Sequence, residues 1–319
     1  MKVSVLIPTK NGEQYLTEVL GAIFNQEHNF ELDVVIIDSG SSDRTLQIVQ
    51  SFPVKLEQIA PGDFGHGKTR NLGISLCIGD FIALLTQDAV PANKYWLKNI
   101  IQPMLDHDKT AYVYGPHMSR PGCNPFERRN LQAHFNVFLG GKFRKDKLLA
   151  SDVPDTSEYH AKIYASNCNS ALRKSVHEKI LFRDVNMAED QAWALDIMKA
   201  GFNKVYEPKA SVLHSHDYSA KKYFYRFFDE YQSHKEQKNY QEIKSFLEIL
   251  PRAGALAIRD FAYIIKQKDY NFLNKIYWMF FVTRVSINRM IAAYLGGRYE
   301  KLPKWLYEKL SMQKRIIKQ

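Results

Sequence analysis

Short apolar runs alternate with amphipathic segments along the first third of the chain. The runs Val3–Ile7, Leu32–Ile37 and Phe81–Leu85 are nearly continuous in apolar residues, which is typical of strands buried on both faces. The segments 12–24 and about 69–78 carry apolar residues at helical spacing, and a polar loop after the second run offers N-caps for another helix. This alternation predicts an α/β fold with a mostly parallel sheet covered by helices.

The pattern is less regular after position 110. Proline and glycine interrupt the stretch 110–165, so we expect it to be irregular and to cover the site, with a strand at 162–165. A helix near 188–193 and two short strands at 202–206 and 210–213 are predicted next. The last hundred residues, 220–319, are rich in aromatics and are predicted to be helical.

Polar residues stand at the ends of three predicted strands. Thr9, Asp38 and Asp88 each follow an apolar run directly or within a few residues. In a parallel sheet the ligand binds beyond the carboxyl ends of the strands, where these loops collect. The three residues are therefore expected to converge, although they are far apart in the sequence.

Composition and charge narrow the class of protein. Of the 319 residues 45% are hydrophobic and 13% aromatic, which indicates a globular chain and excludes a disordered one. The net charge of +10 is concentrated late in the chain, because residues 240–319 hold 15 Lys and Arg against 6 Asp and Glu. Three widely spaced cysteines show no disulfide framework and no metal-ligand spacing, which favours a reducing cytosol. We expect neither a signal peptide nor a spanning helix, since the apolar run at 276–283 ends after eight residues.

Three motifs, in this order, resemble the family 2 glycosyltransferases. They are Val5-Leu6-Ile7-Pro8-Thr9-Lys10-Asn11-Gly12, then Asp38-Ser39-Gly40-Ser41-Ser42-Asp43-Arg44-Thr45, and then Glu189-Asp190-Gln191 followed by a histidine cluster. The resemblance implies a GT-A fold, a nucleoside diphosphate sugar donor, a divalent metal and inversion at the anomeric carbon. It covers roughly residues 1–220, which we expect to form the GT-A catalytic domain, with a nucleotide-binding half at 1–110 and an acceptor half at 111–220. Residues 221–319 are then a basic, aromatic-rich helical extension.

One motif departs from the family pattern. The Asp-x-Asp motif of the family appears as Thr86-Gln87-Asp88, so only its last carboxylate is present. With Phe64-Gly65-His66-Gly67-Lys68-Thr69-Arg70-Asn71 upstream, this motif resembles the rhamnosyltransferase branch, in particular the streptococcal-type α-1,3-rhamnosyltransferases of cell-wall polysaccharide synthesis. That resemblance implies dTDP-β-L-rhamnose as donor and a hydroxyl of a lipid-linked saccharide as acceptor. A UDP-sugar donor is an alternative, as is a catalytically inactive nucleotide-sugar-binding or scaffold protein, because the first carboxylate is missing.

Asp88 and His214 are the expected ligands of Mn²⁺ or Mg²⁺. A divalent metal stabilises the negative charge that develops on a diphosphate leaving group. His216 lies two residues after His214, so both side chains would point the same way on a strand, and His216 could contact the metal or a phosphate instead. Gln87 is a secondary candidate. The alternatives are a helix N-cap for Asp88 and a structural role for the histidine pair.

Asp190 is the expected catalytic base. Inversion by a single displacement needs one group that takes the acceptor proton. Glu189 beside it adds negative potential, which favours the protonated form of a neighbouring carboxyl group. Gln191 and Trp193 could contact acceptor or phosphate, and Trp193 could equally belong to the core. A solvated helix start is the alternative for Glu189 and Asp190.

The remaining candidates concern the nucleotide. Asp38 is placed to accept the N3–H of thymine or uracil, or alternatively to open the Ser/Gly loop as an Asx turn, and Thr9 could contact base or ribose. Arg70 and Lys68 are cations suited to a diphosphate, with solvated surface charge as the alternative. His66, flanked by glycines, could contact sugar or phosphate.

The basic tail suggests a membrane surface. The segment 271–297 is amphipathic and carries basic and aromatic residues, so an anionic inner leaflet could hold the protein reversibly. A helical subdomain packed on the catalytic domain, or a dimer surface in a homo-oligomer, explains the same pattern. A nucleic-acid-binding protein is the alternative from a different functional class, but the sequence contains no recognised nucleic-acid-binding motif. We therefore expect a cytoplasmic enzyme, peripheral on the inner face of the cell membrane, with no nucleic-acid partner.

Overall fold

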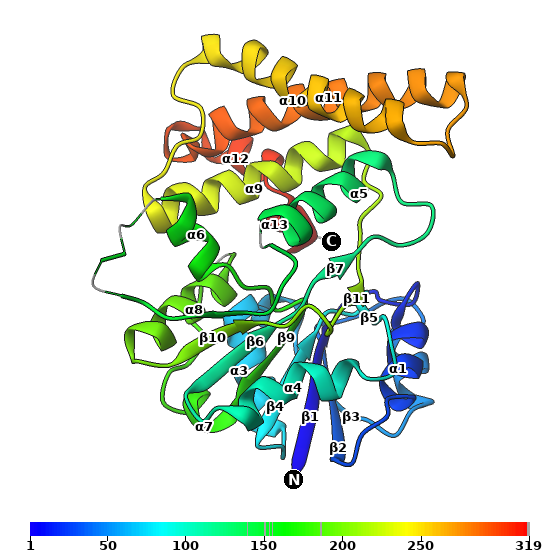
Figure 1. Cartoon of the computed structure of the whole chain (residues 1–319), viewed down its shortest axis with the longest axis vertical. Helices are drawn as coiled ribbons and strands as arrows, with labels where there is room; N and C mark the ends of the chain where they lie inside the picture. Colours follow the sequence, from blue (N-terminus) through cyan, green and yellow to red (C-terminus); the bar gives the residue numbers. More distant parts are fainter. Residues whose placement is uncertain (139, 150, 153, 155, 186, 318–319) are drawn as a thin grey trace. The chain divides into compact units, whose positions relative to one another are not determined.

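The computed structural model describes residues 1–138, 140–149, 151–152, 154, 156–185 and 187–317 (Figure 1). The chain divides into two compact units. The first consists of residues 1–120 and 131–214, and the second of residues 121–130 and 215–319. The second unit thus begins a few residues before position 220 and also takes a short segment from the middle of the chain.

An eight-stranded sheet forms the centre of the first unit. Its strands follow the order β3 (Lys55–Gln58), β2 (Glu31–Asp38), β1 (Lys2–Thr9), β4 (Phe81–Leu85), β9 (Asn169–Arg173), β6 (Thr110–Tyr114), β10 (Asn203–Tyr206) and β8 (Arg144–Asp146). The first four strands in this order are parallel to one another, and β6 and β10 are parallel to each other. β9 is antiparallel to both of its neighbours, and β8 is antiparallel to β10. The predicted α/β fold with a mostly parallel sheet is confirmed.

Helices cover both faces of this sheet. One core packs the sheet against α1 (Leu16–Phe24), α2 (Thr45–Gln50) and α4 (Trp96–Asp106). The other packs it against α3 (His66–Leu76), α6 (Ser157–Ile163), α7 (Lys174–His177) and α8 (Glu189–Lys199). Successive strand residues alternate between the two cores, so Val5 and Ile7 face one while Leu6 faces the other. This double burial is why the strands are almost continuously apolar.

The stretch 110–165 is more regular than its sequence suggests. Besides β6 and β8 it holds β7 (His117–Met118), α5 (Pro125–Gln132), a π-helix η2 (Ala133–Phe138) and α6. The strand predicted at 162–165 is wrong, because α6 continues to Ile163. The hydroxyl oxygen of Thr156 accepts the Tyr159 N–H at 3.1 Å and caps this helix, which buries Ile163 in the core beside α8. Packing and capping here outweigh the local strand propensity.

A second, three-stranded sheet lies in the same unit. Its central strand, β11 (Val212–Leu213), pairs antiparallel with β5 (Val90–Pro91) and parallel with β7. β5 starts two residues after Asp88 and β11 ends one residue before His214. The small sheet therefore ties together two segments that hold candidate metal ligands.

The second unit is helical, as predicted for the end of the chain. Its helices are α9 (Ala220–Lys238), α10 (Ile249–Lys266), α11 (Phe272–Gly296), α12 (Lys304–Leu310) and α13 (Met312–Ile317). Single turns of 3₁₀ helix occur here at η3 (Phe246–Glu248) and η4 (Tyr299–Lys301), and in the first unit at η1 (Pro61–Asp63). α11 packs against both α9 and α10. Among the helices that the structure describes, none has the length and apolar content needed to cross a bilayer.

Candidate active site

Asp38 organises the loop between β2 and α2. Thr9 and Asp38 are register partners at the ends of β1 and β2. One oxygen of the fully buried Asp38 carboxylate accepts the N–H groups of Gly40 and Ser41, each at 3.0 Å. The other accepts the hydroxyls of Thr9, at 3.2 Å, and Ser41. Gly40 has φ of +85°, which suits glycine in such a turn.

These contacts correspond to the Asx-turn alternative for Asp38. A carboxylate offers about four acceptor positions, of which the loop fills three and the Thr9 hydroxyl of β1 the fourth. The contact of Asp38 with a base N3–H stays a prediction, and the observed role of this carboxylate is to order the loop after β2. Thr9, which was expected to contact base or ribose, is buried with its hydroxyl turned toward Asp38.

Gln87 connects the ends of β1 and β4. Its side-chain oxygen accepts the Lys10 N–H at 2.8 Å, and its side-chain N–H₂ donates to the Lys10 carbonyl at 3.0 Å. A Cβ on Gly12 would lie 2.7 Å from the Gln87 oxygen, so the loop after β1 is closely fitted to this side chain. Gln87, a secondary candidate, thus links the segment that holds Asp88 to the loop after β1.

The small sheet brings Asp88 and His214 together. Leu213 pairs with Val90 across β11 and β5, and the His214 N–H donates to the Met118 carbonyl at 2.9 Å. The Asp88 carboxylate oxygen lies 3.5 Å from Nε2 of His214. Both histidines of the cluster follow β11 rather than lie on it, which differs from the strand geometry expected.

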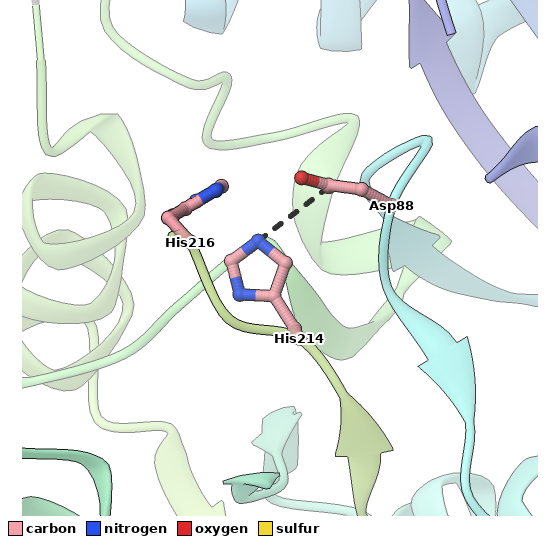
Figure 2. A group of neighbouring side chains, drawn as sticks. All are labelled: Asp88, His214 and His216. Carbon is pink, nitrogen blue, oxygen red and sulfur yellow. Dashed lines mark ion pairs between the residues drawn. The ribbon is translucent and has the colours of Figure 1, made fainter. Parts of the chain in front are cut away.

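Figure 2 shows Asp88, His214 and His216 pointing toward a common space. One ligand atom from each lies within 4.8 Å of the other two. Ligands at about 2.2 Å from one ion stand at most about 4.4 Å apart, so small side-chain rotations complete a site. One carboxylate oxygen and two imidazole nitrogens form a mixed donor set for a divalent transition metal, and they leave positions open for phosphate oxygens or water. His216 is stacked on Tyr218 with ring centroids 4.7 Å apart.

Arg120 supports this cluster, and sequence reasoning missed it. One guanidinium nitrogen donates to the Asp88 carbonyl at 2.8 Å, and another pairs with Glu18 at 3.0 Å. The guanidinium also lies over the Tyr15 ring, 3.9 Å from its centroid. Arg120 belongs to no motif and sits on a loop, so no local signal identifies it.

Asp190 lies in the first turn of α8 with both carboxylate oxygens oriented by main-chain donors. The Asn167 N–H donates to one oxygen at 3.1 Å, and the Gln191 N–H donates to the other at 2.8 Å. Burial, followed by the charge of Glu189, raises the pKa of Asp190 to about 7. Ala188, just before the pair, is held at φ +63°, a left-handed conformation that non-glycine residues rarely adopt.

Arg70 and Glu189 form a buried ion pair beside Asp190. Nη1 of Arg70 lies 2.8 Å from Oε1 of Glu189, which also accepts the Asn167 side-chain N–H at 3.0 Å. Burial alone would raise the pKa of Glu189, but the charges of Arg70 and His66 hold this pKa below its usual value. Arg70, predicted to contact a diphosphate, has its guanidinium buried and paired with Glu189 in this structure.

Asn167 is a second residue that sequence reasoning missed. Its side-chain oxygen accepts the Tyr112 hydroxyl at 2.6 Å and the Ser170 hydroxyl at 3.0 Å. Its side-chain N–H donates to Glu189, and its main-chain N–H donates to Asp190. It thus fixes the acidic pair from the loop before β9. The polar sequence Ser166-Asn167-Cys168-Asn169 ahead of a buried strand is the only signal that could have suggested it.

The remaining candidate residues lie at the surface, at the start of α3, in the core and beside Asp190. Lys68 is exposed and lies 3.7 Å from Asp63, a surface pair as the alternative had it. His66 begins α3, and its ring contacts that of Phe64. Trp193 belongs to the core, where its indole N–H donates to the Ile180 carbonyl at 2.6 Å. The main chain of Gln191 orients Asp190 as described above.

Contacts between strand ends bring Thr9, Asp38 and Asp88 to one edge of the sheet, as expected. Burial, followed by the charge of Asp88, raises the pKa of the Cys168 thiol to about 11, and the charge of Asp190 acts in the same direction. On the other side, Gln87 links the Asp88 loop to Lys10, whose neighbour Thr9 contacts Asp38. The loop that Asp38 orders and the Asp88 segment therefore share one edge of the sheet. Asp190 lies at the same edge, because it accepts the N–H of Asn167 just before β9, and Asn169 at the start of β9 pairs with Leu85 at the end of β4.

Comparison with known sequences identifies relatives. The sequence model of glycosyl transferase family 2 matches residues 4–181. The O-antigen chain rhamnosyltransferase RfbN of Salmonella typhimurium is 31% identical over 235 residues, which cover 72% of this chain and 71% of RfbN. The O-antigen chain rhamnosyltransferase WbaN of Salmonella anatum is 30% identical over 230 residues, covering 71% and 70%.

Solved structures share the fold. The mannosyltransferase PcManGT of Pyrobaculum calidifontis, in complex with GDP-Man and Mn²⁺, superposes with a TM-score of 0.59 and 17% identity, covering 94% of this chain and 88% of its own. TarS 1–349 of S. aureus in complex with UDP gives a TM-score of 0.54 and 19% identity over 95% and 93% of the two chains. These likenesses confirm the expected GT-A fold.

Proposed function

Because the chain belongs to glycosyl transferase family 2 and is therefore a glycosyltransferase, we propose that it moves L-rhamnose from dTDP-β-L-rhamnose to a hydroxyl of a lipid-linked saccharide. The product has an α-linkage and serves polysaccharide synthesis at the cell surface. The observation that carries the transfer chemistry is the oriented Asp190 carboxyl, with its pKa near 7, on the same sheet edge as the Asp88, His214 and His216 cluster.

The identity of the donor sugar rests on the relatives. RfbN and WbaN are rhamnosyltransferases that match more than two thirds of this chain. The structural neighbours bind GDP-Man with Mn²⁺ or UDP, which supports a nucleoside diphosphate sugar as donor. In this chain, the loop that Asp38 orders supports nucleoside binding at this edge, and the exposed Lys68, which lies 3.7 Å from Asp63, would reach a diphosphate by side-chain rotation.

The reaction is a single displacement at C1 of the sugar. The acceptor oxygen forms a bond to C1 as the bond from C1 to the diphosphate oxygen breaks, and dTDP leaves with the electron pair. Asp190 takes the proton of the acceptor hydroxyl, and its pKa near 7 allows it to be ionised beforehand yet basic enough to accept that proton. The two main-chain N–H groups from Asn167 and Gln191 hold the carboxylate in place during this step.

A divalent metal fits the second group of residues. Asp88, His214 and His216 would hold it, and it would supply positive charge to the leaving diphosphate. Two imidazole ligands favour Mn²⁺ over Mg²⁺, because Mg²⁺ prefers oxygen donors.

A panel of nucleotide sugars tests the donor. The purified protein is screened with dTDP-β-L-rhamnose, UDP-glucose, UDP-N-acetylglucosamine and GDP-mannose, each with Mn²⁺, by the rise in melting temperature. A ligand at 100 times its Kd adds about 2.7 kcal/mol to the free energy of unfolding. We expect the dTDP sugar to give the largest shift and to release dTDP when a saccharide acceptor is added. A larger shift and faster turnover with a UDP sugar would establish the alternative donor.

We further propose that the protein acts at the inner face of the cell membrane, where a lipid-linked acceptor is available. The basic second unit supports this location, since an anionic leaflet contributes about 1 kcal/mol for each nearby Lys or Arg.

A further inference from the structure

α10 carries an apolar face that points to solvent within the described chain. Leu250 is 70% exposed and Ile258 is 67% exposed. The exposed residues recur every three or four positions and therefore share one side of the helix. They are Leu247, just before the helix, and then Leu250, Pro251, Gly254, Ala255, Ile258, Ala262 and Ile265. The opposite side of α10 holds Ala253, Ala257 and Ile264, which are buried in the core of the second unit.

The first turns of α11 extend this exposed apolar surface. Figure 1 shows α10 and α11 as a hairpin joined by a short loop. Phe272, at 76%, and Phe280, at 70%, are strongly exposed, together with Leu273, Ile276 and Tyr277. The exposed apolar stretch ends at Arg284, after which Val285 and Met290 are buried. Only the first turns of the segment 271–297 are therefore apolar surface, since the rest of its apolar residues build the core.

Basic residues line one flank of the α10 face. Arg252, Arg259 and Lys266 are exposed and stand seven positions apart, so they form one row along the helix. The carboxylates of this region are Glu242, Glu248, Asp260 and Asp269. Glu242 lies 3.1 Å from Arg252, and Asp269 is exposed in the turn after α10, beyond the basic row. Glu248 is partly buried and pairs with Arg252 at 2.8 Å, and Asp260 is buried in an ion pair with Arg129.

We propose that this hairpin face, formed by the exposed apolar residues of α10 and of 272–280 with the Arg252–Arg259–Lys266 row, docks in the plane of an anionic lipid bilayer. Large apolar side chains enter the boundary between headgroups and acyl chains, and the basic row contacts anionic headgroups, as in interfacial amphipathic helices. Tyr277 lies on this face and suits the same boundary. The inference rests on the proposed membrane location and assigns the surface that produces it.

Charge complementarity favours lipid over a second copy of the chain. A two-fold dimer uses the same patch on both subunits, so the basic row of one copy would meet a patch that has basic and apolar residues and no exposed acidic partner along α10 in the described structure. Anionic headgroups supply the missing negative charge. Contiguous exposed apolar residues of this extent are themselves typical of docking surfaces.

Vesicle flotation with the full chain tests the proposal. The parent protein and the variant L250Q/I258Q are mixed at low salt with vesicles of phosphatidylcholine alone or with phosphatidylglycerol. We expect the parent to float with the anionic vesicles, and the variant to bind them roughly tenfold or more weakly because two inserted side chains are lost. R259Q/K266Q should lose the preference for anionic over neutral vesicles. Ile78 and Lys98, exposed in the first unit, provide the matched controls I78Q and K98Q, which should bind like the parent.

Two further measurements separate the outcomes. Circular dichroism checks folding, and light scattering gives the oligomeric state without vesicles. A parent that stays with the dense fraction, or an L250Q/I258Q variant that floats like the parent, overturns the proposal. A parent dimer that L250Q/I258Q converts to monomer shows that the face joins two copies instead. For the parent protein and each variant, the release of nucleoside diphosphate is also measured with a soluble acceptor. If the parent floats with anionic vesicles but releases no nucleoside diphosphate, the proposed reaction fails and the membrane proposal stands.

Discussion

Nη1 of Arg70 lies 2.8 Å from Oε1 of Glu189, and both side chains are buried. This pairing holds the negative charge on Glu189 and, through it, helps to keep the proton on the adjacent Asp190 up to a pH of about 7. The two neighbouring carboxyl groups are thereby separated in function. One is a permanently charged anchor, and the other can exchange a proton at neutral pH.

Replacing Asp190 by asparagine should abolish most of the transfer and leave donor affinity nearly unchanged. General-base catalysis contributes about 10²–10⁴-fold, so we expect kcat to fall by this factor while nucleotide-sugar binding persists in calorimetry. The variant should also melt a few degrees higher at pH 8, because the native pKa lies above the unfolded one and ionising the folded site then costs stability. Ordinary turnover in D190N would contradict the assignment.

Activity should rise with pH until Asp190 is ionised. Below pH 7 the protonated carboxyl cannot accept the acceptor proton, so kcat/KM is expected to fall by about tenfold per pH unit. Glu189→Gln removes the neighbouring charge, lowers the pKa of Asp190 and moves this limb of the profile to lower pH. A pH profile of E189Q identical to that of the parent would show that Glu189 does not set the pKa.

Removing Arg70 alone should destabilise the fold. R70M leaves Glu189 buried without its cation, which typically costs about 3–5 kcal/mol in the free energy of unfolding. The double variant R70M/E189M should recover much of this loss in urea unfolding, since neither charge is then buried alone. K68M is the matched control, because its exposed ammonium makes only a surface pair and should change stability by less than about 0.5 kcal/mol.

Metal affinity should depend on all three residues of the cluster. D88N, H214A and H216A are each expected to weaken Mn²⁺ binding by about 100-fold or more, measured by electron paramagnetic resonance of free Mn²⁺. Activity that persists in excess EDTA, or Mn²⁺ affinity that survives D88N, would show that the ion is held elsewhere.

Arg120 should act on the metal site without being part of it. R120Q removes the bond to the Asp88 carbonyl and the stacking on Tyr15, so Mn²⁺ affinity is expected to fall by roughly 10-fold, less than in D88N. R120K tests the geometry, since an ammonium cannot make the two divergent contacts of the guanidinium. If R120Q leaves Mn²⁺ affinity intact while the melting temperature falls, its role is in folding only.

The hydrophobic pattern by itself determined much of the architecture. Continuous apolar runs such as Val3–Ile7 predicted strands buried on both faces, and the two cores on either side of the sheet bear this out. The same reasoning placed Asp38 and Asp88 at strand ends, because a strand must end where its side chains turn polar. Periodicity and strand ends are local properties, and a single sequence displays them directly.

What each polar side chain contacts was decided only by the tertiary structure. The carboxylate of Asp38 accepts hydrogen bonds from its own loop, and the guanidinium of Arg70 pairs with Glu189. Arg120 donates to the Asp88 carbonyl although it belongs to no sequence motif. In α10 the periodicity shows an amphipathic helix, but packing on α11 decides which apolar residues stay exposed. Each of these outcomes depends on contacts with residues from distant parts of the chain. The distance and burial of those residues set the charge state and the orientation of each polar group, and the spacing of residues along the sequence does not reveal which residues will meet.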